Sequence, residues 1–300
     1  MVETTYNFEK SVALLYQNDS HRGPGKVVQN LKAGLEKIGV SIHQMYDSRP
    51  WKYTGCLQYC EPETLVHCAK SGNPILMGPN LFVLPPDNPS LCKLFNHFVV
   101  PSQWVKDKYE EFELMKGKNV YVWSVGIDTE EWCPANSTDD PLDCFIYFKN
   151  RSDQDLTVVE AICRKFGLSY DLIKYGNYQE DDLKALCARS KFCVLLTGTE
   201  SQGIAYMQIL STNTPCYVFN SPVWKSEDGK ETAKASSVPY WDERCGFISD
   251  NVNLEHFQTF LEECKRKSFS PRDYILENHT LEKAAENYYS LLEKTFETNT

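Results

Sequence analysis

A carboxylate, a glycine and a carboxamide follow a strand-like apolar run in residues 197–215, TGTESQGIAYMQILSTNTP. Glu200 comes just after the run, Gly203 begins a helix-like pattern, and Gln208 lies eight residues beyond Glu200. Eight residues are about two helical turns, so both side chains can project toward one ligand. A plain strand-to-helix connection needs only a turn and an N-cap. The spacing therefore predicts that this junction hydrogen-bonds a ligand beyond the end of the strand.

Two cations follow a second strand-like run in FKNRSDQDLT, residues 148–157. Lys149 and Arg151 stand where a helix is about to begin, a natural site for a diphosphate because cations and helix N-terminal amides both attract anions. Asp153 and Asp155 also spell a DxD pattern, and such a pair can hold a divalent metal together with a substrate phosphate. Capping of the helix by Asp153 and a favourable first-turn charge on Asp155 are the preferred interpretation. We therefore predict no metal site.

Glycine and aromatic residues occupy two more loops that follow strand-like runs. The glycines of NDSHRGPGK, residues 18–26, let the backbone approach a ligand at a helix N-terminus, although a tight turn would use them equally well. The tyrosines of KYGNYQEDD, residues 174–182, stack on a nucleobase in one interpretation and cap the core in the other. The residues concerned are Gly23, Gly25, Tyr175, Gly176 and Tyr178.

These loops connect strand-like and helix-like runs that alternate along the chain, the pattern of an α/β fold with parallel sheets. CPANSTDDPLD, residues 133–143, is polar, contains two prolines and predicts a linker. We therefore expect an N-terminal domain over 1–137, a C-terminal domain over 138–279 and a final helix in 280–300. Ligands of such sheets bind beyond the carboxyl ends of the strands, and between two domains this means a cleft. The predicted strands are 11–18, 40–45, 74–78, 97–101, 119–125, 144–149, 169–176, 191–198 and 215–220, and the predicted helices are 26–39, 102–112, 155–167, 179–190, 203–212 and 280–296.

Composition argues against several classes of partner. The 300 residues carry a net charge of −10 and no basic stripe, which disfavours nucleic acid and acidic lipid as partners. No apolar run approaches the roughly 20 residues that a transmembrane helix needs. The N-terminus, MVETTYNFEK, lacks the pattern of a signal peptide, so we expect a cytoplasmic protein.

The sequence contains 12 cysteines, which raises the question of disulfides or metal sites. Most of them lie inside apolar runs, where cysteine behaves as a small buried hydrophobe. Cys56, Cys60, His67 and Cys68 are conceivable zinc ligands, but their spacing matches no paired zinc pattern and no second pair follows. We expect reduced, structural thiols.

The motifs resemble those of nucleotide-sugar glycosyltransferases with the GT-B fold, glycosyltransferase family 4 (glycosyl transferases group 1) in particular. TESQGIAYMQILSTNTPCYVFN is similar to the E-x7-E region of that family, which continues to a Thr-Pro dipeptide, here Thr214-Pro215. FVVPSQWVKDKYEE and VYVWSVGIDTEEWCP resemble two further family segments, so the resemblance covers about residues 11–220. Gln208 replaces the family's second glutamate, and the usual R-x4-K pair is absent.

The resemblance implies two Rossmann-like domains that face each other across a cleft, with the C-terminal helix crossing back to the first domain. It implies a hexosyl- or related transferase (EC 2.4) that moves a sugar from a UDP- or GDP-sugar to a hydroxyl of a glycan or small-molecule acceptor. The reaction would be retaining, and neither a cofactor nor a divalent metal is expected, because protein cations can stabilise the leaving diphosphate.

The roles of individual residues are also implied by the resemblance. Glu200 would contact hydroxyls of the donor sugar, Gln208 would contact the ribose, and Lys149 and Arg151 would neutralise the diphosphate. The amides of Gly203, Ile204 and Ala205 would bind the diphosphate or sugar, and the glycine loop of the first domain would approach it. The predicted catalytic residues are Glu200, Lys149 and Arg151. The predicted donor site also includes Gly23, Gly25, Tyr175, Gly176, Tyr178, Gly203, Ile204, Ala205 and Gln208. The predicted acceptor residues are His21, Arg22 and His97, and either histidine could equally have a structural role.

A catalytically silent sugar- or nucleotide-binding module and a sugar-nucleotide epimerase are alternatives. Gln208 favours the silent module, because an amide is an uncharged and therefore weaker partner for hydroxyl groups. On this basis Gln208→Glu is expected to keep or tighten nucleotide binding. The same departure leaves retention or inversion at the sugar open.

Overall fold

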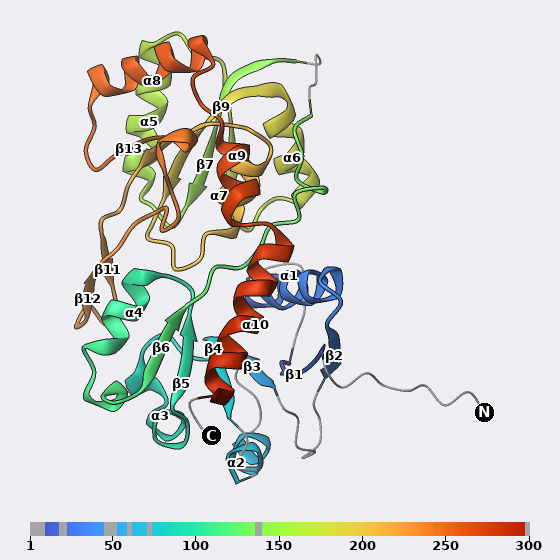
Figure 1. Ribbon diagram of the computed structural model, residues 1–300. Helices are drawn as coiled ribbons and strands as arrows, with labels where there is room; N and C mark the ends of the chain where they lie inside the picture. The colour runs from blue at the N-terminus through green and yellow to red at the C-terminus, as the bar shows by residue number, and fades with distance from the viewer. Residues whose placement is uncertain are drawn as a thin grey trace. The chain divides into compact units, whose positions relative to one another are not determined.

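The computed structural model describes residues 10–17, 23–44, 53–58, 62–70, 74–135 and 140–297. They form two compact units, which we describe one at a time (Figure 1). The first unit comprises Met1–Gly126 and Thr280–Thr300, and the second comprises Ile127–His279. Residues 136–139 of the predicted linker, and residues 18–22 of the predicted glycine loop, lie outside the described residues.

The first unit contains a parallel sheet in the order β2-β1-β3-β4-β5-β6. All five residues of its central strands β1 and β3 are buried, as expected for a parallel sheet that is covered on both faces. The strands are β1 (Ser11–Leu15), β2 (Ser41–Gln44), β3 (Thr54–Gln58), β4 (Ile75–Asn80), β5 (His97–Val100) and β6 (Asn119–Val122). The helices are α1 (Pro24–Lys37), α2 (Pro62–Lys70), α3 (Pro89–Leu94), α4 (Gln103–Glu110) and α10 (Leu281–Glu297), with short 3-10 turns at Pro85–Asp87 and Glu113–Met115.

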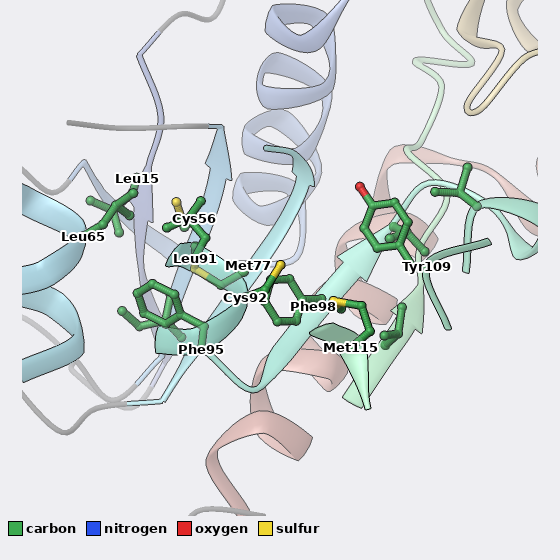
Figure 2. Packing of buried hydrophobic residues seen from close by; sticks show 14 of the residues in the cluster. Leu15, Cys56, Leu65, Met77, Leu91, Cys92, Phe95, Phe98, Tyr109 and Met115 are labelled. Carbon is green, nitrogen blue, oxygen red and sulfur yellow. The ribbon is translucent and has the colours of Figure 1, made fainter. Parts of the chain in front are cut away.

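One face of this sheet packs against α2, α3 and α4 through an apolar cluster (Figure 2). Phe98 of β5 and Met77 of β4 lie at its centre, and Leu91 and Tyr109 cover them from α3 and α4. Burial of each such side chain contributes about 1.5–3 kcal/mol relative to exposure. This cluster holds in place the strands from whose ends the loops of the first unit leave.

The C-terminal helix α10 belongs to the first unit, although about 150 residues of sequence separate it from the rest. It lies beside α1, and Gly34 allows the close approach because a Cβ there would meet Leu281 and Ala285. The indole N–H of Trp123 donates to the Ala284 carbonyl at 2.8 Å. The first unit is therefore completed by the end of the chain.

The second unit contains a parallel sheet in the order β13-β10-β9-β7-β8 and a separate antiparallel pair, β11 with β12. Its core joins the buried strand residues to Phe257 and Phe260 of α8. The strands are β7 (Leu142–Lys149), β8 (Tyr170–Lys174), β9 (Ser190–Thr197), β10 (Cys216–Phe219), β11 (Val223–Lys225), β12 (Thr232–Lys234) and β13 (Gly246–Ser249). The helices are α5 (Asp153–Lys165), α6 (Glu180–Arg189), α7 (Ile204–Ser211), α8 (Leu254–Arg266) and α9 (Pro271–Asn278), with a 3-10 turn at Glu243–Cys245.

The predicted strands and helices are all present, with small differences at their ends. Between residues 220 and 280, where no strand or helix is predicted above, the structure contains α8 and α9. The Asn253 side chain caps α8 by accepting the His256 N–H, and apolar residues recur along α8 with helical spacing. That signal was present in the sequence and was missed. Among the described helices, none is long and apolar enough to cross a bilayer.

Cysteines line the interior of both units. Ten described cysteines are free thiols, and eight of them are buried. Cys144, Cys193 and Cys216 lie on three neighbouring strands of the second sheet and are 0% exposed. They pack as small apolar side chains, as expected for structural cysteines. Of the four conceivable zinc ligands, Cys60 and the side chain of Cys68 lie outside the described part of the chain, whereas Cys56 is buried in β3.

Candidate functional site

The carboxyl edge of the second sheet brings together residues that are far apart in the sequence. β7 pairs in parallel with both β8 and β9, and Lys149, the last residue of β7, lies opposite Thr197, the last residue of β9. The loop after β9 then places Glu200 against Lys149, with 2.7 Å between Oε1 and Nζ. The same ammonium lies 4.4 Å from the ring centroid of Tyr175, which follows β8. Three loops thus meet at one ion pair.

This ion pair is largely removed from water. The side chains of Lys149 and Glu200 are 19% and 13% exposed. Burial raises the pKa of the Glu200 carboxyl above its usual value, and the charge and hydrogen bond of Lys149 oppose the shift. Buried ion pairs add little to stability relative to apolar side chains of the same size, because both charges lose their hydration. A functional role explains the pair better than a stabilising one.

Helix α7 begins beside Glu200 with its N-terminus uncapped by a side chain. Its N-cap is Gly203, in a left-handed conformation with φ of 76°, and its first turn contains no acidic residue. A Cβ at Gly203 would meet the Tyr206 ring, so both the conformation and the space require glycine. The first helical residues, Ile204 and Ala205, are half-buried. Their amides and the positive end of the helix dipole suit an anion.

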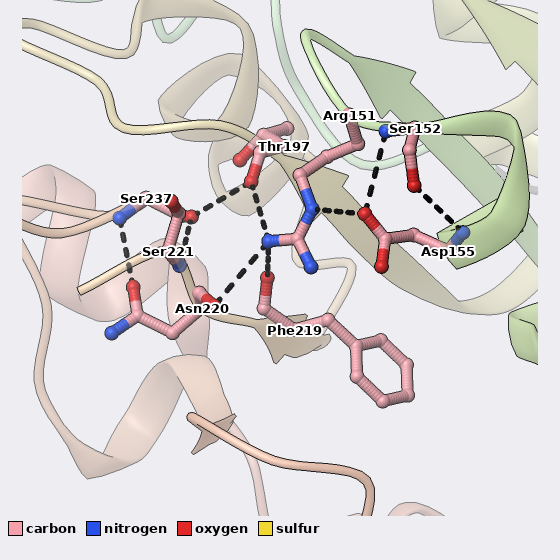
Figure 3. Close-up of polar contacts among 8 residues, drawn as sticks. All are labelled: Arg151, Ser152, Asp155, Thr197, Phe219, Asn220, Ser221 and Ser237. Atoms are coloured by element: carbon pink, nitrogen blue, oxygen red, sulfur yellow. Dashed lines mark hydrogen bonds and ion pairs between the residues drawn. The ribbon is translucent and has the colours of Figure 1, made fainter. Parts of the chain in front are cut away.

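Arg151 occupies a different environment from the one that its sequence position suggested (Figure 3). Its Nη1 donates to the backbone carbonyls of Thr197, Phe219 and Asn220 at 3.3–3.4 Å. Its Nε donates to Asp155 at 3.1 Å. Arg151 therefore connects the ends of β9 and β10 with the start of α5. Arg151 stays a predicted ligand of the diphosphate, and its Nε and Nη1 already have partners within the protein.

The DxD pattern next to Arg151 has a structural use. Asp155 accepts the Ser152 N–H at 3.3 Å, while the Ser152 hydroxyl accepts the Asp155 N–H at 3.1 Å. This reciprocal pair is a capping box. Ser152 is therefore the N-cap, rather than Asp153, which is the first residue of α5. In the described ranges between 10 and 297, no group of three or more His, Cys, Asp or Glu residues could hold a metal ion.

The remaining donor-site residues of the second unit lie around the same edge. Tyr175 is 48% exposed, and Gly176 has φ of 87° in the turn that follows. The Tyr178 hydroxyl lies 3.2 Å from that of Tyr147, a buried residue of β7. Gln208 is 5% exposed on α7.

Sequence reasoning missed a return loop that supports Glu200. The Ser236 carbonyl accepts the Glu200 N–H at 2.9 Å. Ser237 donates its N–H to Asn220 at 2.8 Å and its hydroxyl to the Thr197 carbonyl at 3.0 Å. This loop lies about 40 residues beyond β9 in the sequence, and nothing in its spacing indicates that it returns to the site.

In the first unit, the predicted residues that the structure describes, Gly23, Gly25 and His97, do not gather in one place. Gly23 is the N-cap of α1, with φ of 55° and no side-chain cap, and Gly25 is buried in its first turn. His97 is the first residue of β5, so it lies at the amino edge of the sheet, opposite to the edge that α1 follows. Burial lowers the pKa of His97, which keeps its ring neutral near pH 7. The other predicted acceptor residues, His21 and Arg22, lie outside the described residues.

Comparison with known structures identifies the class of this architecture. The two Rossmann-like units with their parallel sheets have the fold of GT-B glycosyltransferases, as the sequence resemblance implied. Models of known protein families match no part of the sequence, and no curated protein is similar to it in sequence. The structural similarity therefore exceeds any similarity in sequence.

Three solved structures illustrate the match. Anabaena Alr3699/HepE, in complex with UDP and glucose, is 9% identical to this chain. The match covers 95% of this chain and 100% of that chain, with a TM-score of 0.55. The lipopolysaccharide outer core galactosyltransferase WaaB is 8% identical, with coverages of 95% and 99% and a TM-score of 0.57. An α-glucosyltransferase in complex with UDP and a 13-mer DNA is 9% identical, with coverages of 94% and 99% and a TM-score of 0.57.

Proposed function

We propose that this protein is a glycosyltransferase that moves a sugar from a UDP- or GDP-sugar to an acceptor hydroxyl. The observation that carries the proposal is the shielded Lys149–Glu200 ion pair beside the uncapped N-terminus of α7. It combines, at one sheet edge, a cation, oriented amides and a carboxylate. Solved structures with the same fold contain UDP together with glucose or with a 13-mer DNA, which supports a nucleotide-sugar donor.

The chemistry follows from where charge develops. Cleavage of the sugar–diphosphate bond builds negative charge on the leaving diphosphate and positive charge on the sugar ring. Lys149 and the first amides of α7 would stabilise the diphosphate, which is electrostatic stabilisation by groups already in place. Glu200 would accept hydrogen bonds from hydroxyls of the sugar. Because these groups supply the stabilisation, we propose a metal-independent reaction. Retention at the sugar is proposed from the family resemblance alone.

The assignment of roles differs from the sequence-based one at two residues. Arg151 acts as a positioning residue for the strand ends, since its donors bind carbonyls and Asp155. His97 is left out of the acceptor side, because it lies at the amino edge of its sheet. We assign acceptor recognition to the first unit, and Gly23 and Gly25, at the start of α1, keep the donor role predicted for them.

Nucleoside diphosphate should stabilise the protein without a divalent metal. We expect UDP or GDP, at about 100 times its Kd, to raise Tm by several degrees, because a ligand that binds only the folded state stabilises it. The measurement is a thermal unfolding series with and without EDTA, followed by a turnover assay with UDP- and GDP-hexoses. Loss of the shift in EDTA would restore the DxD pair as a metal site. A shift without any turnover, in the presence of acceptor sugars, would identify a silent binding module.

Lys149→Met should weaken nucleoside diphosphate binding about tenfold or more, because a charge-assisted hydrogen bond to phosphate is lost. The matched control is Lys191→Met, which removes an ammonium from the amino end of β9, where it pairs with Asp143. Calorimetric titration with UDP and GDP measures the effect. Since Lys149→Met removes the ion pair of the shielded Glu200 carboxylate, the double variant Lys149→Met/Glu200→Gln should show the same weakening with both charges removed. Equal affinity in Lys149→Met and Lys191→Met would place the diphosphate elsewhere.

A further inference from the structure

Two polar side chains at neighbouring strand ends of the first unit have buried atoms without partners. Ser102, which follows β5, is 0% exposed, and its hydroxyl oxygen has no hydrogen-bond partner in the part of the chain that the structure describes. The side-chain nitrogen of Asn80, the last residue of β4, is likewise buried and without a partner there. Most buried polar atoms in proteins are hydrogen-bonded, because an unpaired one loses its hydration without replacement. The site proposed above uses neither atom, so both require another explanation.

The two residues come from the same edge of the first sheet. β4 and β5 are neighbouring parallel strands, and their register places Met77 opposite Phe98. Asn80 lies three residues beyond Met77, and Ser102 lies four residues beyond Phe98. Because neighbouring strands are about 5 Å apart, this register brings both residues to adjoining positions at the carboxyl edge. Ligands of parallel sheets bind beyond that edge.

Helix α4 begins at the same point, and its N-terminus is not capped by a side chain. Ser102 is the N-cap and has the extended backbone that capping requires, but its side chain accepts no amide hydrogen bond. Ser152, the N-cap of α5, is also extended and does accept one, at 3.1 Å. The first turn of α4 contains no acidic residue to balance the positive end of the helix dipole. The Tyr109 hydroxyl of α4 donates to the Phe82 carbonyl at 2.9 Å, which holds the loop after β4 beside the helix.

The groups at this point are hydrogen-bond donors, so they select a ligand that accepts. The Asn80 side-chain nitrogen can only donate, the Ser102 hydroxyl can donate, and the first amides of α4 donate along the helix dipole. We infer that the start of α4, together with Ser102 and Asn80, is a binding site for an oxyanion such as a phosphate group. Asn80 is half-buried and Gln103 is exposed, so the site lies next to solvent. It belongs to the first unit, and its occupation does not require the function proposed from the second.

Ser102→Ala should leave the protein without ligand as stable as the wild type, or more stable. Alanine removes a buried hydroxyl that bonds nothing in the described residues, so no hydrogen bond is lost. Thermal unfolding without ligand should therefore give a Tm that is equal to that of the wild type or about 1–3 °C higher. A Tm lower by several degrees would show that the hydroxyl supports the fold, which would overturn the inference.

Binding is measured by calorimetric titration of the full chain with inorganic phosphate, glucose 6-phosphate and glucose at fixed ionic strength. The wild type should bind both phosphates about tenfold or more tightly than glucose, which has no charge for the helix start to attract. Ser102→Ala should weaken the binding of both phosphates about tenfold, because one hydrogen bond to a charged group is lost. Asn80→Asp should weaken it at least as much, since a carboxylate repels the anion. Ser270→Ala is the matched control and should change nothing, because Ser270 is also an N-cap without a capping bond on an eight-residue helix, but Asp273 occupies its first turn.

Phosphate can also bind at the diphosphate site proposed around Lys149, so Lys149→Met is titrated beside these variants. Phosphate binding that survives Lys149→Met and falls in Ser102→Ala supports the site at α4. Binding that falls in Lys149→Met but not in Ser102→Ala, or no binding of either phosphate to the wild type, would overturn it and leave the proposed function standing.

The two phosphates distinguish the sources of the anion. Glucose 6-phosphate bound about tenfold more tightly than inorganic phosphate, with the difference lost in Ser102→Ala, would assign the oxyanion to an acceptor sugar. Equal affinity would assign it to a free ion. Failure of UDP and GDP to bind the wild type would overturn the proposed function and leave the oxyanion site standing.

Discussion

Glu200→Gln should lower the rate of sugar transfer about 100-fold or more while the affinity for the bare nucleoside diphosphate stays equal or rises. The rate falls because an electrostatic contact to the sugar, used mainly in the transition state, is lost. The affinity does not fall, because the nucleoside diphosphate has no sugar to bind. It can rise because the Lys149 ammonium, now 2.7 Å from the Glu200 carboxylate, becomes available to the diphosphate alone.

Transfer kinetics with a UDP- or GDP-hexose, measured beside calorimetry with the matching diphosphate, check both halves of this result. Glu160→Gln is a suitable control, since Glu160 is a partly exposed carboxylate of the same unit that pairs with Arg164 on α5. It should change neither quantity. Full transfer activity in Glu200→Gln would show that the carboxylate only neutralises Lys149, and the assignment of the sugar contact would be withdrawn.

Arg151→Ala should destabilise the protein by about 2–4 kcal/mol, because three carbonyls lose the donor Nη1 and Asp155 loses the donor Nε. The carbonyls belong to the ends of β9 and β10, from which the loop of Glu200 leaves. We therefore expect transfer activity to fall as well, even at temperatures where the variant is folded. Urea unfolding followed by tryptophan fluorescence gives the free energy of unfolding.

Arg189→Ala is the matched control for Arg151→Ala. Both arginine side chains are 20% exposed, but Arg189 pairs with the exposed carboxylates of Asp140 and Asp171. Such surface pairs contribute at most about 1 kcal/mol. If Arg151→Ala proved as stable as Arg189→Ala and bound nucleoside diphosphate more weakly, Arg151 would be a ligand of the diphosphate, as its sequence position suggested.

The fold could be predicted from the sequence because its signals are local. Apolar runs followed by helical spacing, as in the passage from β9 to α7, identify the alternation of a parallel sheet. The placement of Lys149 and Glu200 at one edge also follows, since both come after strands and parallel strands end on the same side. The elements that were missed, such as α8, lie in a region where short strands and turns interrupt the pattern.

The contacts within the site could not be predicted, because they depend on register and on helix packing. The 2.7 Å distance between Lys149 and Glu200 requires that Lys149 align with Thr197, which no spacing along the chain encodes. The diphosphate role predicted for Arg151 rests on its residue type and on its place after β7. Only the positions of three carbonyls reveal its other use.

The cysteine-rich interior makes the unfolded chain chemically more vulnerable than the folded one. In the native protein, burial raises the pKa of thiols such as Cys187 and Cys245 to about 12, so few thiolates exist to react with an oxidant. Unfolding returns these thiols to water and to an ordinary pKa near 8.5, where exchange and disulfide formation proceed. Wrong pairs formed at that stage cannot be accommodated inside closely packed strands. Recovery from denaturation thus depends on a reducing environment, and oxidation converts a transient unfolding event into a permanent loss.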